Sequence, residues 1–181
     1  MAKRIAEIVI LCEDLSQGNF AAFYLKRRRG YRKMRIQNSP SSGGSGEQYV
    51  REHYPDEVKS YRNSSTRRTA ALVVAVDADT KAIAYREKQL EKELQRVGQT
   101  KRKKSEKIAH LIPKRNIETW ILCLNGDRVN ETTDYKSTKD IDRKIKQAAE
   151  TFFDWSRDGY PVPALCVTSL QKGLKEIRRV D

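Results

Sequence analysis

Four acidic residues stand where their carboxylates could act together. Asp77 and Asp79 are one residue apart, directly after the apolar run at 71–76, while Glu13 and Glu118 follow two other apolar runs. Two carboxylates so close repel each other unless a cation lies between them, and hard oxygen ligands suit Mg²⁺ or Mn²⁺. These residues therefore point to a divalent-metal site. The alternative for Asp79 is that it only caps the following helix.

The segment 71–76 is the element that must position the two aspartates. Its six residues are all apolar and three are valines, which branch at Cβ and favour strands. An unbroken apolar run indicates a strand covered on both faces, as in a parallel sheet between helices. Ligands bind beyond the carboxyl ends of such strands, where Asp77 and Asp79 fall.

The remaining chain alternates between strand and helix patterns. Further strands are expected at 5–12, 33–37 and 108–112, with a short one at 165–167. Helices are expected from Ser16 to the basic end at Arg27 and Arg28, over 47–62 with a break near Pro55, over 80–97, after the cap Asn116, over 141–155, and after the cap Ser169.

This order predicts an α/β fold. We expect a Rossmann-like three-layer sandwich with a mainly parallel central sheet, in which the 5–12 and 71–76 strands are adjacent. The length of 181 residues fits one domain over 1–181. Its core would span about 5–125, followed by a C-terminal helical extension over about 126–181.

Composition limits the class of protein. The three cysteines Cys12, Cys123 and Cys166 are odd in number and lie mostly in apolar runs. They are typical of buried thiols in a cytosolic protein, not of a disulfide framework or zinc site. No apolar stretch approaches transmembrane length and no signal peptide is evident, so we expect a cytoplasmic protein without a membrane partner.

The net charge of +13 is unevenly placed. Residues 81–116 hold 12 Lys or Arg against 4 Asp or Glu, whereas 117–181 hold 11 of each. Clustered basic charge favours nucleic acid, DNA or RNA, as the partner. The candidate phosphate-binding residues are Arg27, Arg28, Lys101, Arg102, Lys103, Lys104, Lys114 and Arg115. For the run 101–104 the alternative is a solvated loop.

The glycine- and serine-rich stretch 38–46 lacks the Lys-Ser/Thr ending of a P-loop, which excludes a P-loop ATPase. It could offer backbone N–H groups to a phosphate or form only a surface connection. Glu118 also has two interpretations. In the first turn of its helix it complements the helix dipole, or it points into the crevice shared with Glu13 and the aspartates.

These motifs resemble the Toprim domain of topoisomerases, bacterial primases, small ribonucleases and nucleases of the OLD (overcoming lysogenisation defect) family. The matching residues are Glu13 in Val-Ile-Leu-Cys-Glu, and Asp77 and Asp79 in Val-Val-Ala-Val-Asp-Ala-Asp. The Asn-Ile-Glu-Thr-Trp segment at 116–120 is similar to the further acidic element of OLD-like members. The resemblance covers about residues 5–125, and the glycine that usually follows the first Glu is here Asp14.

The resemblance implies Mg²⁺-dependent cleavage or transfer of phosphodiesters. Asp77 and Asp79 would hold the metal, Glu118 a second one, and Glu13 would be a ligand or general acid/base. A role in phage defence or repair would follow, with an ATPase subunit on a separate chain, because OLD nucleases carry an ATPase domain that this chain lacks. The oligomeric state is not indicated.

Three other interpretations stay open. A haloacid-dehalogenase phosphatase also uses Asp-x-Asp, but its Thr or Val belongs at position 81, which is Lys81 here. A phosphoryl-receiver domain gathers acids above a parallel sheet, yet the basic middle segment fits it poorly. The non-enzymatic alternative is a Toprim-like scaffold that binds nucleic acid or a partner.

Overall fold

The computed structural model describes residues 5–28, 30–65 and 69–181. Its centre is a four-stranded sheet in the order β2-β1-β3-β4, made of β1 (Ile5–Cys12), β2 (Tyr31–Asn38), β3 (Ala70–Ala75) and β4 (Ile108–Leu111). All three strand pairs are parallel. Ile10 of β1 lies beside Val73 of β3, so the predicted central neighbours are confirmed.

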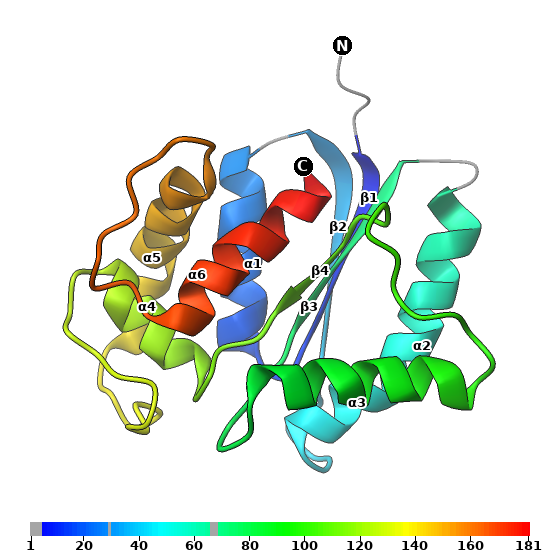
Figure 1. The fold of residues 1–181 in the computed structure, drawn as a ribbon, viewed down its shortest axis with the longest axis horizontal. Coiled ribbons are helices and arrows are strands. Elements are labelled where there is room, and N and C mark those ends of the chain that lie inside the picture. Colours follow the sequence, from blue (N-terminus) through cyan, green and yellow to red (C-terminus); the bar gives the residue numbers. More distant parts are fainter. Residues whose placement is uncertain (1–4, 29, 66–68) are drawn as a thin grey trace.

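Helices cover both faces of the sheet, which makes three layers (Figure 1). One face carries α1 (Leu15–Arg28), α4 (Ile117–Leu124), α5 (Ile141–Ser156) and α6 (Thr168–Ile177), followed by the 3-10 turn Arg178–Val180. The other face carries α2 (Gly46–Ser65) and α3 (Ile83–Arg96). The predicted α/β sandwich with a parallel sheet is therefore confirmed.

Alternation along the strands explains the two cores. In β3, Ala71 and Val73 join the cluster under α1, while Leu72 and Val74 join the cluster under α2 and α3. All six β3 residues are buried, as the unbroken apolar run predicts for a strand covered on both faces. Trp120 and Phe152, both fully buried, stack with ring centroids 6.0 Å apart in the larger core.

Three local predictions were wrong. The α2 helix continues through Pro55, because Val50, Tyr54 and Val58 pack into the core on both sides of the proline and outweigh its cost of about 3 kcal/mol. Residues 165–167 form a turn and coil instead of a strand. Ser169 lies inside α6, whose cap is Val167.

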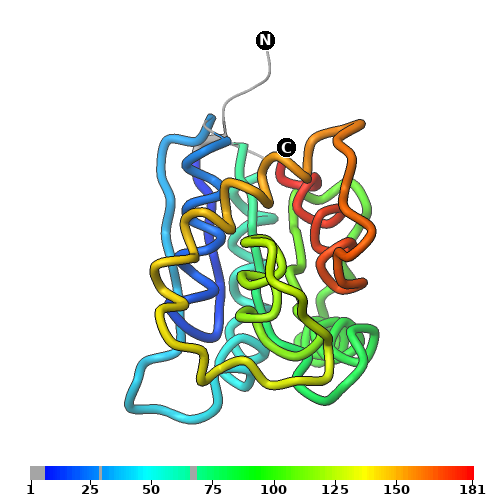
Figure 2. The backbone as a smooth tube through the Cα atoms, turned by 90° about the vertical axis from the view of Figure 1, so that its left-hand side faces the viewer, coloured from blue at the N-terminus to red at the C-terminus, as the bar shows by residue number. Residues whose placement is uncertain are grey.

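Parallel strands place all their carboxyl ends at one edge, here called the carboxyl edge. The 38–46 loop, α3 and the loop 125–140 all lie at that end of the molecule, opposite the C-terminus (Figures 1 and 2). Among the described residues, no helix combines the length and apolar character needed to cross a membrane.

Candidate metal and catalytic site at the carboxyl edge

The four predicted acidic residues all lie near the carboxyl edge. Glu13 directly follows β1, Asp77 and Asp79 follow β3, and Glu118 lies in the first turn of α4, after β4. Because β1 and β3 are neighbours and β3 pairs with β4, their ends converge. The sheet topology therefore brings together residues that are up to 105 positions apart in the chain.

Glu13 and Asp77 are joined by hydrogen bonds. The backbone N–H of Asp77 donates to Glu13 Oε1 at 2.5 Å, and the side-chain amide of Gln17 donates to Asp77 Oδ1 at 2.9 Å. Gln17 Oε1 in turn accepts from the backbone N–H of Glu13 at 3.0 Å. Gln17 is fully buried and links the Asp77 carboxylate to the Glu13 backbone. Sequence reasoning missed it, although it stands in the first turns of the helix after Glu13.

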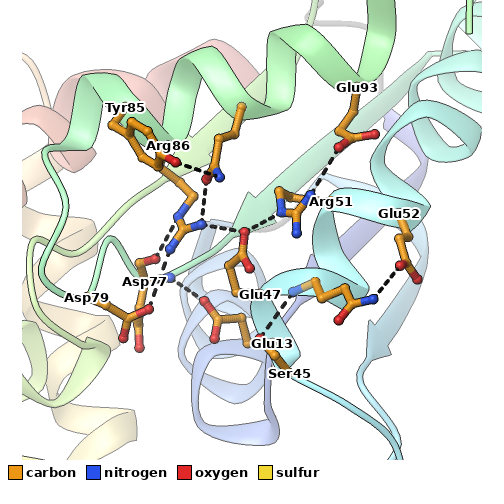
Figure 3. A network of polar contacts seen from close by, with 12 residues as sticks. Glu13, Ser45, Glu47, Arg51, Glu52, Asp77, Asp79, Tyr85, Arg86 and Glu93 are labelled. Carbon is orange, nitrogen blue, oxygen red and sulfur yellow. Dashed lines mark hydrogen bonds and ion pairs between the residues drawn. The ribbon is translucent and has the colours of Figure 1, made fainter. Parts of the chain in front are cut away.

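Arg86 is the second residue that sequence reasoning missed. It is a charged residue of α3, yet it is only 4% exposed. Its Nε donates to the backbone carbonyl of Asp77 at 3.0 Å, and its guanidinium contacts Glu47 and lies 3.5 Å from Asp79 Oδ2 (Figure 3). Its position four residues before Leu90, on the apolar stripe, was the available signal.

Asp79 does not cap α3. It adopts a left-handed backbone conformation with φ 55°, and α3 begins later, at Ile83, with Ala82 as its cap. The Asp79 carboxylate instead lies between two cations, with Oδ2 3.5 Å from Arg86 and Oδ1 3.9 Å from Lys136 Nζ. The capping alternative is therefore wrong, and in the part of the chain that the structure describes the Asp79 carboxylate makes no hydrogen bond to the backbone at the start of α3.

Glu118 is the most isolated of the four carboxylates. It is 8% exposed, and its Oε2 has no hydrogen-bond partner among the described residues. Burial raises its pKa, and Asp14 adds to the shift. The helix cap is Asn116, whose Oδ1 accepts from the N–H of Thr119 at 3.3 Å. Glu118 lies in the first turn and interacts with its own backbone N–H, as the helix-dipole interpretation predicts. Its charge acts on Asp77, which supports the crevice interpretation.

Burial and mutual repulsion dominate the electrostatics. The pKa of Glu13 is raised to about 7, chiefly by burial and also by the charges of Asp79 and Asp14, against the hydrogen bond from the Asp77 N–H and the charge of Lys136. The pKa of Asp77 is raised well above its usual range, first by burial and then by Glu13. A cation between these groups would remove the repulsion that shifts them.

The donor set fits a hard divalent cation in its chemistry, although the side chains are not arranged as ligands. Among the described residues, no group of three or more His, Cys, Asp or Glu side chains is placed to hold one ion. The reason is local, because Asp77 Oδ1 and Glu13 Oε1 are both engaged in hydrogen bonds. The fit is therefore one of donor chemistry, with hard carboxylate oxygens that include the unpaired Oε2 of buried Glu118.

A lysine that sequence reasoning did not consider lies among these acids. Burial opposes the charge of Lys136, yet the negative charges of Asp77, Asp79, Glu13 and Glu118 raise its pKa. Its side chain is half exposed, and its Nζ lies 3.9 Å from Asp79 Oδ1. Lys136 belongs to the loop 125–140 between α4 and α5. Nothing in its sequence context marks it, since long-range folding alone brings that loop to the carboxyl edge.

The predicted phosphate-binding residues divide between the two ends of the molecule. Lys114 and Arg115 directly follow the β4 region at the carboxyl edge, where Lys114 Nζ donates to the Lys81 carbonyl at 2.5 Å. The others lie before β2 or before β4, towards the opposite edge: Arg27, Arg28, Lys101, Arg102, Lys103 and Lys104. Arg102 is occupied structurally, with Nη1 2.5 Å from Glu176.

A groove of about 580 Å³ opens beside Glu13. Asp14, Ser16 and the 38–46 loop line it. Gly46 begins α2 against Glu13 so closely that a Cβ there would lie 2.8 Å from Glu13 Cβ. The glycine thus lets the start of a helix approach a candidate catalytic carboxylate.

Comparison of the chain with protein-family models, with curated proteins and with solved structures gave no significant match.

Proposed function

We propose that this protein is a metal-dependent nuclease that hydrolyses nucleic-acid phosphodiesters, as the Toprim resemblance implies. The observation that supports it most is that Glu13, Asp77, Asp79 and Glu118 follow the ends of neighbouring parallel strands, where their charges act on one another and on Lys136. Negatively charged phosphodiesters can approach such a cluster only with cations. The adjoining groove gives a polymer access to it.

Each acidic residue has a distinct role in this proposal. Asp77 and Asp79 would supply carboxylate oxygens to Mg²⁺ or Mn²⁺, and Glu118 an additional one. When bound, the metal would neutralise phosphate charge and lower the pKa of an attacking water. Glu13, with its pKa raised to about 7, suits proton transfer near neutral pH. Gln17 and Arg86 hold Asp77 in place through its side chain and its backbone carbonyl.

The partner would be DNA or RNA, including structured RNA, because no residue of the site reads base identity. Lys81 and Lys114 lie at the carboxyl edge and would hold phosphates that flank the reacting one. An ATPase subunit on a separate chain is a further candidate partner, in a defence or repair system, because the OLD nucleases that the motifs resemble carry an ATPase domain.

The test is incubation of the purified chain with labelled DNA and RNA in Mg²⁺, in Mn²⁺ or in chelator. Wild type should cut at least one substrate only with metal. Glu13→Gln should fold and be inactive, because the amide cannot transfer the proton. Glu7→Gln is the matched control, since it makes the same change within β1, near the end of the strand away from Glu13, and it should retain activity.

Two results would count against the proposal. Cleavage by Glu13→Gln at the wild-type rate would remove Glu13 from the mechanism. The second result is that the chain binds nucleic acid without metal and does not cut it, even when an ATPase partner is added. That result would favour a second function, in which the protein is a non-catalytic subunit that binds nucleic acid or a partner. The absence of a preformed metal-ligand group among the described residues is the observation on the side of that alternative.

A further inference from the structure

Lys136 is held in place by its own loop. Its backbone N–H donates to Asp134 Oδ1 at 2.9 Å, forming a tight side-chain turn. The same Asp134 oxygen accepts from the Asn116 side-chain amide at 2.8 Å. Asn116 is also the cap of α4, the helix that carries Glu118. Asn116 therefore connects the start of α4, which carries Glu118, to the turn that carries Lys136.

This anchoring sets the lysine over the crevice. Its ammonium is 3.9 Å from Asp79 Oδ1, and its charge interacts with all four carboxylates. Arg86, the other cation of the cluster, is buried and tied to the Asp77 carbonyl and to Glu47, on the side of α2 and α3 (Figure 3). Lys136 approaches from the opposite layer, on the loop that joins α4 and α5.

The side of the crevice formed by α4 has a carboxylate oxygen without a hydrogen-bond partner among the described residues. Glu118, which is more than nine-tenths buried, keeps one oxygen unpaired on the side of α4. A divalent ion entering there would meet oxygen donors and, beside Asp79, the ammonium of the half-exposed Lys136 side chain. A second divalent ion would have to displace the Lys136 ammonium or lie beside it. Two positive charges in contact with the same carboxylates repel each other strongly.

We propose that Lys136 is a built-in second cation of this site: the four carboxylates take one divalent ion, and the Lys136 ammonium occupies the position of another. This inference rests on the proposed function, because it assumes that the carboxylates bind a metal. It specifies that the site works with one metal ion per chain. It also assigns the loop 125–140 a role in cation selection.

The test is calorimetric titration of the full-length chain with Mn²⁺ alone, which needs no substrate and no activity. Wild type should bind one Mn²⁺ per chain. Lys136→Met should bind a second Mn²⁺, or bind the first at least tenfold more tightly, because the competing positive charge is gone. Lys136→Arg keeps the charge and should behave as wild type. Lys139→Met removes an exposed cation from the same loop and is the matched control.

The outcomes separate the two proposals. Two Mn²⁺ per wild-type chain, or Lys136→Met with unchanged stoichiometry and affinity, would overturn the role of Lys136 while leaving a metal site. No Mn²⁺ binding by wild type would overturn both this inference and the metal dependence of the proposed function. If Lys136→Met does not fold by circular dichroism, Lys136→Gln carries the same test, since it keeps a polar side chain of similar length.

Discussion

At the scale of single residues, Glu13 shows how burial sets the behaviour of a carboxyl group. Its pKa rises from an ordinary value of 4.5 to about 7, chiefly because burial disfavours the charged form. The folded chain therefore holds a proton that the unfolded chain has already released between those two pH values. Stability must fall as pH rises through that window and stay low above it.

Glu13→Gln should therefore stabilise the metal-free protein at alkaline pH. The amide keeps the oxygen that accepts from the Asp77 N–H and carries no charge. We expect a gain of about 1–3 kcal/mol in the free energy of unfolding above pH 7, at roughly 1.4 kcal/mol per pKa unit. Urea unfolding at pH 8 with chelator measures it.

The same comparison at pH 4.5 is the control, because wild-type Glu13 is protonated there in the folded state and the gain should disappear. A gain of equal size at both pH values would mean that the amide packs better for reasons unrelated to charge. A loss at pH 8 would show that the Glu13 carboxylate is ionised and stabilised in the folded chain, contrary to its raised pKa.

Residue types and their order in the sequence predicted that the four acidic residues lie near the same end of the sheet. They did not predict which other residues contact these acids. Asp77 and Asp79 could be found because an apolar run ends at them. Gln17 and Lys136 could not be found, because their contacts depend on helix packing and on a loop that crosses to the sheet edge. Arg86 could have been found from its spacing to Leu90 and Leu94, which are buried on the same face of α3.

At the scale of elements, β4 is the last strand on its side of the sheet, and side chains instead of another strand bond to its outer backbone groups. Glu176 of α6 accepts from the His110 backbone N–H at 3.1 Å, and Arg102 donates to the Ile108 carbonyl at 2.8 Å. Free edges promote pairing between chains, so this ion pair explains why Arg102 is structural. The sequence shows the basic run 101–104, but it does not show that the side chain of Arg102 points inward.

The α6 helix also depends on a glycine that sequence reasoning passed over. A Cβ on Gly173 would lie 2.3 Å from the Trp120 ring, which is fully buried and held by the bond from its Nε1 to Ser169 Oγ at 2.7 Å. The absent side chain lets α6 lie directly on α4. The predicted helix at the C-terminus was correct in kind, whereas its start and its close contact followed from tertiary packing.

Gly173→Ala should therefore destabilise the protein, although alanine normally favours a helix by up to about 1 kcal/mol. We expect a loss of about 1–3 kcal/mol, or a fall of roughly 2–12 °C in Tm for a chain of this length. Thermal unfolding by circular dichroism measures it. Lys175→Ala, on the exposed side of the same helix, is the control and should change Tm little; a stabilised Gly173→Ala would disprove the close packing.

At the scale of the whole molecule, basic charge and acidic site are less closely associated than the sequence indicates. Residues 81–116 are adjacent in the chain to Asp77 and Asp79, but this segment runs along the molecule from one edge of the sheet to the other. Arg179 of the C-terminal turn donates to the Lys104 carbonyl at 3.1 Å, which fixes that loop near the C-terminus. Sequence proximity could not reveal this separation.

The separation divides the candidate phosphate contacts into two groups. Lys81 and Lys114 lie at the carboxyl edge, whereas Lys103 and Lys104 lie near the other edge. An eight-residue strand such as β1 spans on the order of 25 Å at about 3.3 Å per residue. A nucleic acid whose reacting phosphate lies in the carboxylate crevice would then contact the first pair and leave the second in solvent.

Salt dependence of binding distinguishes the two groups. Each lost phosphate contact should reduce the slope of log affinity against log salt by about 0.7–0.9. In a Glu13→Gln background, which prevents cleavage, Lys81→Ser with Lys114→Ser should reduce the slope by about 1.5. The matched pair Lys103→Ser with Lys104→Ser removes the same charge from exposed side chains and should leave the slope within about 0.3 of the parent.

Fluorescence anisotropy with a labelled oligonucleotide, titrated over a series of NaCl concentrations, gives these slopes. Both pairs lower the net charge equally, so a change caused only by the overall field would be the same in the two variants. A larger change for Lys103 and Lys104 would place the nucleic acid at the edge away from the carboxylates. Because hydrolysis requires the reacting phosphate to reach those carboxylates, that result would leave the basic surface to a bound partner that is not the substrate.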